Sequence, residues 1–248
     1  MNIVLRRATL GIAVLSLIDM SPTACAAEGE GWDWIVAPYL WAASIGTDVN
    51  AEAPPAGTDG AFSDIIDKID GAFMARLEGQ GDHFGLFADG IFLSLADDHD
   101  HPLSHTESDL DAWLLDVAGV WSPGDDRSRG LGLFAGLRYV DVDLGVQVDP
   151  TNPLFDTATI GTNKSYSDAL VGARYTWAFS ERWGLTLRGD GSFGETEGSW
   201  SASAIAQYRT RNGGWLFGYR YLSVEIETGD STTEVTMSGP AIGYGFSF

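Results

Sequence analysis

The sequence predicts an all-β fold, an up-and-down antiparallel transmembrane β-barrel of about 10 strands, with eight or twelve as the alternatives. Three observations predict it. After residue 31 large apolar residues alternate with small or polar ones, which is the period of a β-strand. The alternating segments run for about ten residues or more, enough for a tilted strand to cross a hydrocarbon layer. Short and long breaks largely alternate between them, as in a barrel with tight turns at one end and larger loops at the other.

The first 27 residues have the features of a signal peptide. Arg6 and Arg7 precede a short apolar run, LGIAVLSLI, and small residues follow in SPTACAAE. Such a segment is removed on export, here after Ala27, and residues 28–248 would then form one barrel domain. The only cysteine, Cys25, lies inside this segment. A lipid-modified Cys25 is the alternative, but Pro22 stands where a lipoprotein signal usually has leucine.

The expected strands follow one another with few interruptions. They cover residues 32–47, 71–80, 83–95, 109–121, 130–147, 165–178, 183–194, 199–210, 215–227 and 233–248. An even number of strands places both ends of the barrel domain on the same side. The longer breaks, 48–70, 96–108 and 149–164, are acidic and are expected to be loops. Within the first, FSDIIDKID (62–70) has apolar residues at helical spacing and predicts a short amphipathic helix.

Charged residues share one face of the expected strands, opposite the large apolar side chains. In the segment 183–194, Leu185 and Leu187 take one face, whereas Arg188 and Asp190 take the other. A soluble sandwich or lipocalin-like barrel would turn the charged face to water, and a membrane barrel would turn it into the lumen. The charged set is Arg76, Glu78, Asp89, Asp116, Arg138, Asp168, Arg174, Arg188, Asp190, Arg209 and Arg220.

Three features favour the membrane barrel. The cations of this face are arginines, which suit enclosed pairing with carboxylates. The two lysines of the chain, Lys68 and Lys164, are not among them. Trp and Tyr recur at strand ends, as in the aromatic girdles of membrane barrels. The last strand ends in AIGYGFSF, which puts Tyr244, Phe246 and Phe248 on one face with Gly and Ser on the other.

This ending resembles the C-terminal signature of bacterial outer-membrane barrels. The body resembles a group of uncharacterised proteobacterial outer-membrane β-barrel proteins in the stretches APYLWAASIGTDV, LFAGLRYVDVDL, DALVGARYTW, RWGLTLRGDGSFG, GYRYLSVEIE and SGPAIGYGFSF, across most of residues 32–248. The resemblance implies a place in the cell outer membrane, among its lipid and lipopolysaccharide. It also implies that the barrel-assembly machinery reads Tyr244, Phe246 and Phe248. It implies no activity or substrate.

The charge of the chain narrows the function. The formal net charge of −21 argues against nucleic acid as a partner, because phosphate binding needs a positive surface.

The inward-facing charges could line an ion path, but a barrel of about ten strands has little open lumen. We therefore favour salt bridges that fill the lumen. We therefore expect a small barrel with a structural or surface-interaction role, or a narrow pore. The alternatives are transport of a small or hydrophobic molecule across the outer membrane and a soluble lipid-binding barrel of the periplasm.

One segment, ADDHDHPLSHTESDLD (96–111), contains residues that could ligate a metal. His99, His101 and His105 lie there among carboxylates, a combination that can bind Zn²⁺ or Cu²⁺, but their spacing matches no defined motif and a solvated acidic loop is the alternative. These histidines share one expected loop, whereas a catalytic triad needs support from separate strands. We therefore assign no catalytic residue and expect neither an enzyme nor a cofactor.

Overall fold

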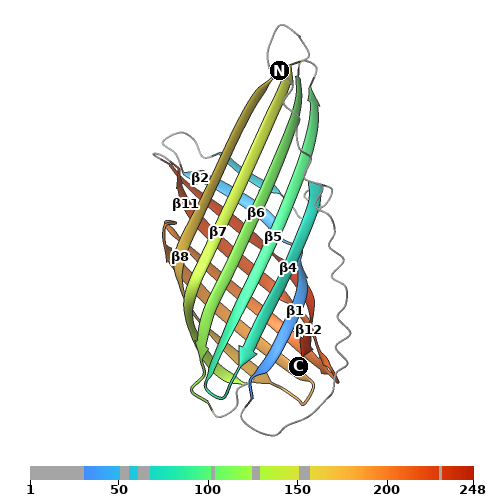
Figure 1. Cartoon of the computed structure of the whole chain (residues 1–248), viewed down its shortest axis with the longest axis vertical. Helices are drawn as coiled ribbons and strands as arrows, with labels where there is room; N and C mark the ends of the chain where they lie inside the picture. Colours follow the sequence, from blue (N-terminus) through green and yellow to red (C-terminus); the bar gives the residue numbers. More distant parts are fainter. Residues whose placement is uncertain are drawn as a thin grey trace. The chain divides into compact units, whose positions relative to one another are not determined.

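A computed structural model describes residues 31–50, 56–60, 68–101, 104–124, 129–150, 157–228 and 231–248, and Gly31–Phe248 form one unit. The described residues contain twelve β-strands (Figure 1). They are β1 (Asp33–Trp41), β2 (Ser44–Asn50), β3 (Ala56–Gly60), β4 (Ile69–Gln80), β5 (Phe84–His101), β6 (Ser104–Trp121), β7 (Gly130–Pro150), β8 (Ala158–Ala178), β9 (Trp183–Gly194), β10 (Gly198–Thr210), β11 (Gly213–Thr228) and β12 (Ser231–Ser247). The predicted signal peptide, residues 1–27, lies outside the described residues and stays a prediction.

The strands close into a barrel. β1 pairs with β4, the strands β4 to β12 pair each with the next, and β12 pairs back onto β1, all antiparallel. The predicted ten-stranded up-and-down barrel is therefore confirmed. β2 continues β1 along the same edge of β12, and β3 folds back onto β2.

Pro240 accounts for the break between β1 and β2. Its carbonyl accepts a hydrogen bond from the Ala42 N–H at 2.9 Å. A residue's N–H and C=O point to the same neighbouring strand of a ladder, and proline has no N–H to donate on that side. The ladder therefore loses a bond opposite Ala42 and Ala43, where the strand predicted over 32–47 is interrupted.

The first and last residues of the barrel domain lie at the same end of the cylinder, which we call the turn end. Trp34 and Phe248 exchange backbone hydrogen bonds of 3.1 and 3.0 Å. The short connections 81–83, 179–182 and 211–212 lie at the same end, because each joins two consecutive strands there. The opposite end carries the β5–β6 and β7–β8 hairpins, and we call it the hairpin end. The prediction that both termini of the barrel lie together is correct.

The prediction of long loops at 96–108 and 149–164 is wrong for most of these residues. β5 and β6 stay paired from Ala96↔Asp109 to His101↔Ser104, and β7 pairs with β8 as far as Val148↔Ala158. These residues lack the apolar alternation of a lumen-lining strand, and the backbone ladder forms without it. Residues 102–103 and 151–156 lie outside the described residues.

The four strands β5–β8 therefore continue past their neighbours as a projecting sheet (Figure 1). On one side, β4 begins to pair with β5 only at Ile69↔Leu95. On the other, β8 pairs with β9 only from Asp168↔Gly194 onward. In the described part of the chain, residues 96–101 of β5 and 158–167 of β8 are thus sheet edges without a neighbouring strand.

The predicted helix over 62–70 is wrong at its C-terminal end. Ile69 and Asp70 belong to β4, where Ile69 pairs with Leu95. Residues 61–67 lie outside the described residues. No helix in the described ranges is long and apolar enough to cross a membrane.

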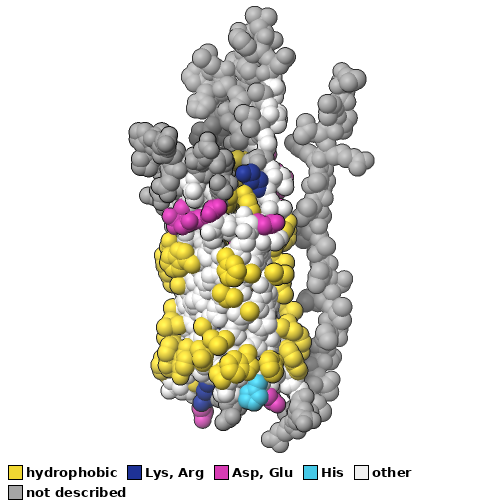
Figure 2. All heavy atoms as spheres, turned by 90° about the vertical axis from the view of Figure 1, so that its left-hand side faces the viewer, with side chains coloured by type: hydrophobic (Ala, Val, Ile, Leu, Met, Phe, Trp, Pro, Cys, Tyr) yellow, Lys and Arg dark blue, Asp and Glu magenta, His cyan; other side chains and the backbone are white. Residues whose placement is uncertain are grey.

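The outer wall of the barrel is apolar, with aromatic side chains in two belts. On the face drawn in Figure 2, hydrophobic side chains gather in two bands, with acidic side chains beyond the band nearer the hairpin end. In the belt nearer the hairpin end, the rings of Phe92 and Trp113 are in contact, with centroids 4.6 Å apart. Eight positions away on the same two strands, Phe84 and Trp121 are cross-strand partners in the belt at the turn end. The turn-end belt continues through ring contacts of Trp183 with Tyr208 and Trp215 with Tyr244.

The interior holds two apolar clusters and a layer of charge between them. The cluster nearer the hairpin end, called here the upper plug, consists of Trp41, Ala43, Met74, Ile91, Leu114, Val140, Leu222 and Val224. The second cluster, nearer the turn end on the β5–β8 wall, consists of Phe87, Ala118, Val120, Phe134 and Leu170. A side chain at Gly172 would overlap the Phe134 ring and the Asp190 Cβ, so glycine allows this close packing.

Candidate functional site: the charged layer and the cavity below it

Strand register gathers the inward charges into one layer. Arg76, Asp89, Asp116 and Arg138 are consecutive cross-strand partners from β4 to β7. Like charges directly opposite one another destabilise a sheet, and Asp89 faces Asp116 in this row. Arg76 and Arg138, at the two ends of this row, each pair with the carboxylate next to them. Arg188 and Arg220 add positive charge to the same carboxylates from β9 and β11.

Arg138 is the most enclosed arginine of the layer, with 1% of its surface exposed. Its Nε donates to Asp116 Oδ1 at 2.7 Å and its Nη2 to Asp116 Oδ2 at 2.9 Å. Nη2 also donates to Asp190 Oδ1 at 2.7 Å, and Nη1 to Ser199 Oγ at 2.7 Å. Two carboxylates and a hydroxyl from three strands thus surround one guanidinium, the fork geometry in which arginine binds carboxylates most strongly.

Arg188, on β9, links the two walls. Its Nε donates to Asp190 Oδ2 at 2.8 Å, and its Nη2 donates to Asp116 Oδ2 at 3.2 Å. Its guanidinium carbon also lies 4.9 Å from the centroid of the Phe87 ring and 4.8 Å from that of Phe134. The aromatic faces attract the cation where carboxylates do not reach it.

Asp89 accepts from both sides of the barrel. The Tyr39 hydroxyl donates to its Oδ1 at 2.7 Å, and Arg76 Nη1 donates to its Oδ2 at 3.3 Å. Arg220 Nη1 lies 3.7 Å from Oδ2 and donates to the Tyr39 oxygen at 3.2 Å. Tyr39 therefore acts as both donor and acceptor between a carboxylate and an arginine of different strands.

Glu78 forms the edge of the layer nearest the turn end. Arg76 donates to its Oε2 through Nε at 3.0 Å and Nη2 at 2.9 Å, and Arg174 pairs with its Oε1. Arg174 Nη2 also donates to Gln80 Oε1 at 3.1 Å. In the described residues the layer thus contains five arginines, Arg76, Arg138, Arg174, Arg188 and Arg220, and four carboxylates, Glu78, Asp89, Asp116 and Asp190.

Asp168 is placed inward, as predicted, but it does not pair with an arginine. It is 2% exposed, and it accepts hydrogen bonds from the Ser192 and Thr196 hydroxyls and from the N–H groups of Glu195 and Thr196. Arg138 is its cross-strand partner, but Arg138 turns to Asp116 and Asp190 instead. Asp168 therefore anchors the β9–β10 turn.

We expect Asp168→Ala to lower the free energy of unfolding by about 1–3 kcal/mol, because it leaves buried hydroxyl and N–H donors without an acceptor. Urea titration of the protein folded in lipid vesicles measures this. Glu197→Ala, at an exposed position of the same turn, is the control and should change stability by less than about 0.5 kcal/mol. Equal stability of the two variants would refute the anchoring role.

Arg209 is the second departure from the predicted network. It is exposed, and within the described residues it makes no ion pair. It lies near the turn end of β10, opposite Gly214, and lines a cavity there. The alternation rule placed Arg209 on the correct face but could not give its height along the barrel.

The layer of charge is closed on its hairpin side by the upper plug. Five of the plug residues, Met74, Ile91, Leu114, Val140 and Leu222, lie two positions along their strands from Arg76, Asp89, Asp116, Arg138 and Arg220, respectively. Two positions is one step along the same face of a strand. The interior therefore changes from ionic to apolar within one step, which the prediction of a lumen filled by arginine and carboxylate missed.

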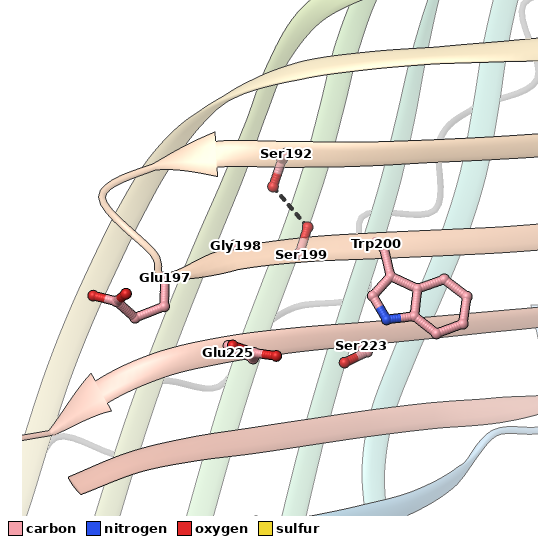
Figure 3. A pocket seen from close by; sticks show the side chains of 7 residues that line it. All are labelled: Ser192, Glu197, Gly198, Ser199, Trp200, Ser223 and Glu225. Carbon is pink, nitrogen blue, oxygen red and sulfur yellow. Dashed lines mark hydrogen bonds between the residues drawn. The ribbon is translucent and has the colours of Figure 1, made fainter.

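A small pocket of about 210 Å³ lies on the hairpin side of Arg138, near the β9–β10 turn. In Figure 3 the hydroxyls of Ser192 and Ser199 point toward each other, 2.6 Å apart, while Glu197 and Glu225 lie nearer the rim. Since Ser199 also accepts from Arg138, a hydrogen-bonded path of hydroxyls connects the buried guanidinium with Asp168.

A larger cavity of about 740 Å³ lies between the charged layer and the turn end. Its lining includes Arg76, Arg188 and Arg220 of the layer and, at the mouth, Arg209 and Arg211. Apolar side chains of β1, β10 and β11 line it too, among them Ile35, Ile205 and Leu216. The inward space on this side is therefore neither filled nor uniformly charged.

The remaining predicted site residues lie at the two ends. Tyr244 and Phe246 face outward at the turn end with ring centroids 4.9 Å apart, and Phe248, 75% exposed, follows β12. His99, His101 and His105 belong to the backbone ladder of the β5–β6 hairpin, not to a loop. Among the described residues no group of three or more His, Cys, Asp or Glu could hold a metal ion. Metal binding by the three histidines stays a prediction.

Sequence reasoning missed several members of the site. Tyr39 and Trp41 face inward on β1, where Arg220 lies 5.1 Å from the Trp41 ring and Trp41 Nε1 donates to the Gly239 carbonyl. The alternation Ile35, Ala37, Tyr39, Trp41 is visible in the sequence, but it does not tell which face turns inward. Phe87 could have been found, since it lies two positions before Asp89 on the same face.

Comparison with known proteins supports the fold. No family model matches the sequence, and no curated protein matches it. The structure is similar to that of the outer membrane protease OmpT from Escherichia coli, with 11% identity, a TM-score of 0.58 and coverage of 88% of this chain and 97% of that one. The transport unit of the autotransporter AIDA-I from Escherichia coli matches with 11% identity, a TM-score of 0.42 and coverage of 90% and 92%. The attachment invasion locus protein Ail of Yersinia pestis matches with 11% identity, a TM-score of 0.34 and coverage of 88% and 100%. The likeness to OmpT shows that the chain has the fold of a bacterial outer-membrane β-barrel, and an identity of 11% leaves its activity open.

Proposed function

We propose that this protein is a small outer-membrane β-barrel with a closed lumen that acts through its projecting sheet, as a surface-interaction protein and not as a conducting pore. Residues Asp33 and Phe248 would face the periplasm, and the projecting sheet would face the exterior. The proposal includes no catalytic step and no cofactor. The observation that carries it is the burial of the ion pairs of Arg138 with Asp116 and Asp190, and of the apolar residues of the upper plug, in the middle of the barrel.

The two aromatic belts support a membrane location. Phe84 and Phe92 on β5, like Trp121 and Trp113 on β6, are eight positions apart. At about 3.3 Å per residue and a tilt of about 40°, this corresponds to a band about 20 Å tall, comparable to the apolar band of outer-membrane barrels. A soluble periplasmic barrel would expose these rings to water while burying its arginines, the reverse of what solubility requires.

The buried ion pairs support a closed lumen. Arg138 and Asp116 have no exposed side-chain surface, so no continuous water path passes between them. On the hairpin side, Trp41 and Leu222 are also almost fully buried. Barrels of this strand number have interiors that side chains can fill.

The projecting sheet supports a role at the surface. Within the described residues, no strand pairs with β5 over 96–101 or with β8 over 158–166, so a partner strand could add to either edge. The segments 96–111 and 141–166 carry many Asp and Glu residues and a single lysine, Lys164. Such a surface attracts cationic partners. Lipopolysaccharide is the neighbouring lipid we expect on this side, and the barrel-assembly machinery remains the partner proposed for Tyr244, Phe246 and Phe248.

Transport of a small or hydrophobic molecule is the second candidate, because the turn-end cavity is large enough to hold one. The cavity stops at the charged layer, so passage would require the ion pairs of Arg138 and Arg188 to separate. This candidate therefore needs a second conformation of the barrel.

Planar-bilayer recording tests the closed lumen. We expect the purified protein to insert without a stable conductance step, because no ion can pass the charged layer and the upper plug. Insertion is checked independently by the shift of the folded protein on a detergent gel after heating. A steady, ohmic conductance from inserted protein would contradict the proposal and favour the narrow pore.

A further inference from the structure

We infer that the turn-end cavity is a binding site for a small organic anion, a molecule with a carboxylate or phosphate group and a short apolar body. This goes beyond the proposed surface role and does not depend on the projecting sheet. It follows from the charge of the cavity lining, from its mixed chemistry and from its size.

The charge of the lining is opposite to that of the protein. Among the described lining residues are seven arginines and three side-chain carboxylates, those of Asp33, Glu78 and Asp89. The whole chain has 14 Lys and Arg residues against 35 Asp and Glu residues. Half of its positive charge therefore surrounds one cavity, and walls of low dielectric concentrate the field inside it.

The floor of the cavity retains positive charge after its internal pairing. Of the charged layer, four arginines line the cavity, Arg76, Arg174, Arg188 and Arg220, beside two carboxylates, those of Glu78 and Asp89. Asp116, Asp190 and Asp168 lie outside this lining. Asp89 is shared among Arg76, Arg188 and Arg220, with separations of 3.3, 4.0 and 3.7 Å. An oxyanion at this floor would therefore meet more arginines than carboxylates.

The mouth adds cations that the floor does not use. Arg209 and Arg211 line the cavity near the β10–β11 turn, and within the described residues neither makes an ion pair. Guanidinium groups bind carboxylate and phosphate oxygens in a bidentate manner. An anion entering from the turn end would meet these two side chains first.

The rest of the lining fits an apolar body and a few polar contacts. Ile35 and Ile205 line the cavity from β1 and β10. Thr186 is the cross-strand partner of Ile205, its hydroxyl lies 2.9 Å from that of Thr176, and Gln207 donates to it. The volume of about 740 Å³ is in the range of small-molecule sites, which combine apolar walls with a few placed polar groups. A single oxyanion on a ring or short chain matches this lining.

Equilibrium dialysis of the folded protein in detergent tests the inference with three probes of one shape. We expect 2-naphthoate or 2-naphthyl phosphate to bind with one site per barrel, and 2-naphthylmethylammonium not to bind. Binding should weaken as salt is added, because the attraction is electrostatic. Failure of both anions to bind, or equal binding of the cation, would overturn the inference.

The double variant Arg209→Gln with Arg211→Gln locates the site. We expect it to weaken anion binding by about tenfold or more, the effect of losing charge-assisted hydrogen bonds. Arg182→Gln is the matched control, since Arg182 is exposed at the same end of the barrel but does not line the cavity, and it should leave binding unchanged. Equal affinities of the two variants would overturn the assignment to this cavity, and the heat shift on a gel confirms that both are folded.

Discussion

Replacing Arg138 by alanine should lower the free energy of unfolding by about 3–5 kcal/mol, the cost of removing one partner from a buried ion pair. The side chains of Arg138, Asp116 and Asp190 have no exposed surface. Without the guanidinium, Arg188 is the arginine that still pairs with the two carboxylates, Ser201 still donates to Asp190, and Ser199 loses the hydrogen bond from Arg138. Urea unfolding of the barrel in lipid vesicles measures the change.

Two further variants make this result specific. Arg138→Lys retains the charge but cannot reproduce the three-sided contact, so its stability should lie between those of the alanine variant and the original protein. Arg182→Ala removes an exposed arginine at the turn end and should change stability by less than about 0.5 kcal/mol. If Arg138→Ala lowered the free energy of unfolding as little as Arg182→Ala, the charged layer would not stabilise the barrel.

The fold could be predicted from the sequence because alternation fixes which residues share a face. Leu187 and Arg188 illustrate this, since adjacent residues with opposite chemistry must point to opposite sides of a strand. The ends of strands were less predictable. His99 to His101 form part of β5 although no apolar alternation marks them, because backbone pairing with β6 alone continues the hairpin.

The site could be predicted as a set of residues but not as an arrangement. Alternation places both Arg138 and Arg209 inward, yet one lies in the middle of the lumen and the other at its mouth. Register decides the height of each residue, and register depends on the lengths of the turns and hairpins around the whole barrel. For the same reason the choice of Asp168 between Arg138 and the β9–β10 turn could not be derived from the sequence.

Replacing Leu137 by arginine should destabilise the barrel in a bilayer by about 2–4 kcal/mol, the cost of placing arginine on the lipid face near the midplane. Leu137 is 64% exposed on the outer wall of β7. It pairs with Val117, which lies halfway between Trp113 and Trp121 of the two aromatic belts. In water the same substitution at so exposed a position would be close to neutral.

Leu144 provides a control on the same strand. It is 37% exposed and lies in the projecting sheet, beyond the belt nearer the hairpin end. Leu144→Arg should change the free energy of unfolding by less than about 0.5 kcal/mol. The two variants carry the same chemical change. Leu144 lies seven positions from Leu137 and therefore on the other face of the strand, so Leu144→Arg reports the effect of an added arginine at a water-exposed position of the same strand.

The difference between these two variants, measured by urea unfolding in lipid vesicles, tests most directly whether the apolar wall of the barrel contacts lipid. A loss of several kcal/mol for Leu137→Arg, beside an almost unchanged Leu144→Arg, is the expected result. Equal and small effects at both positions would mean that Leu137 faces water, and the barrel would then not span a membrane.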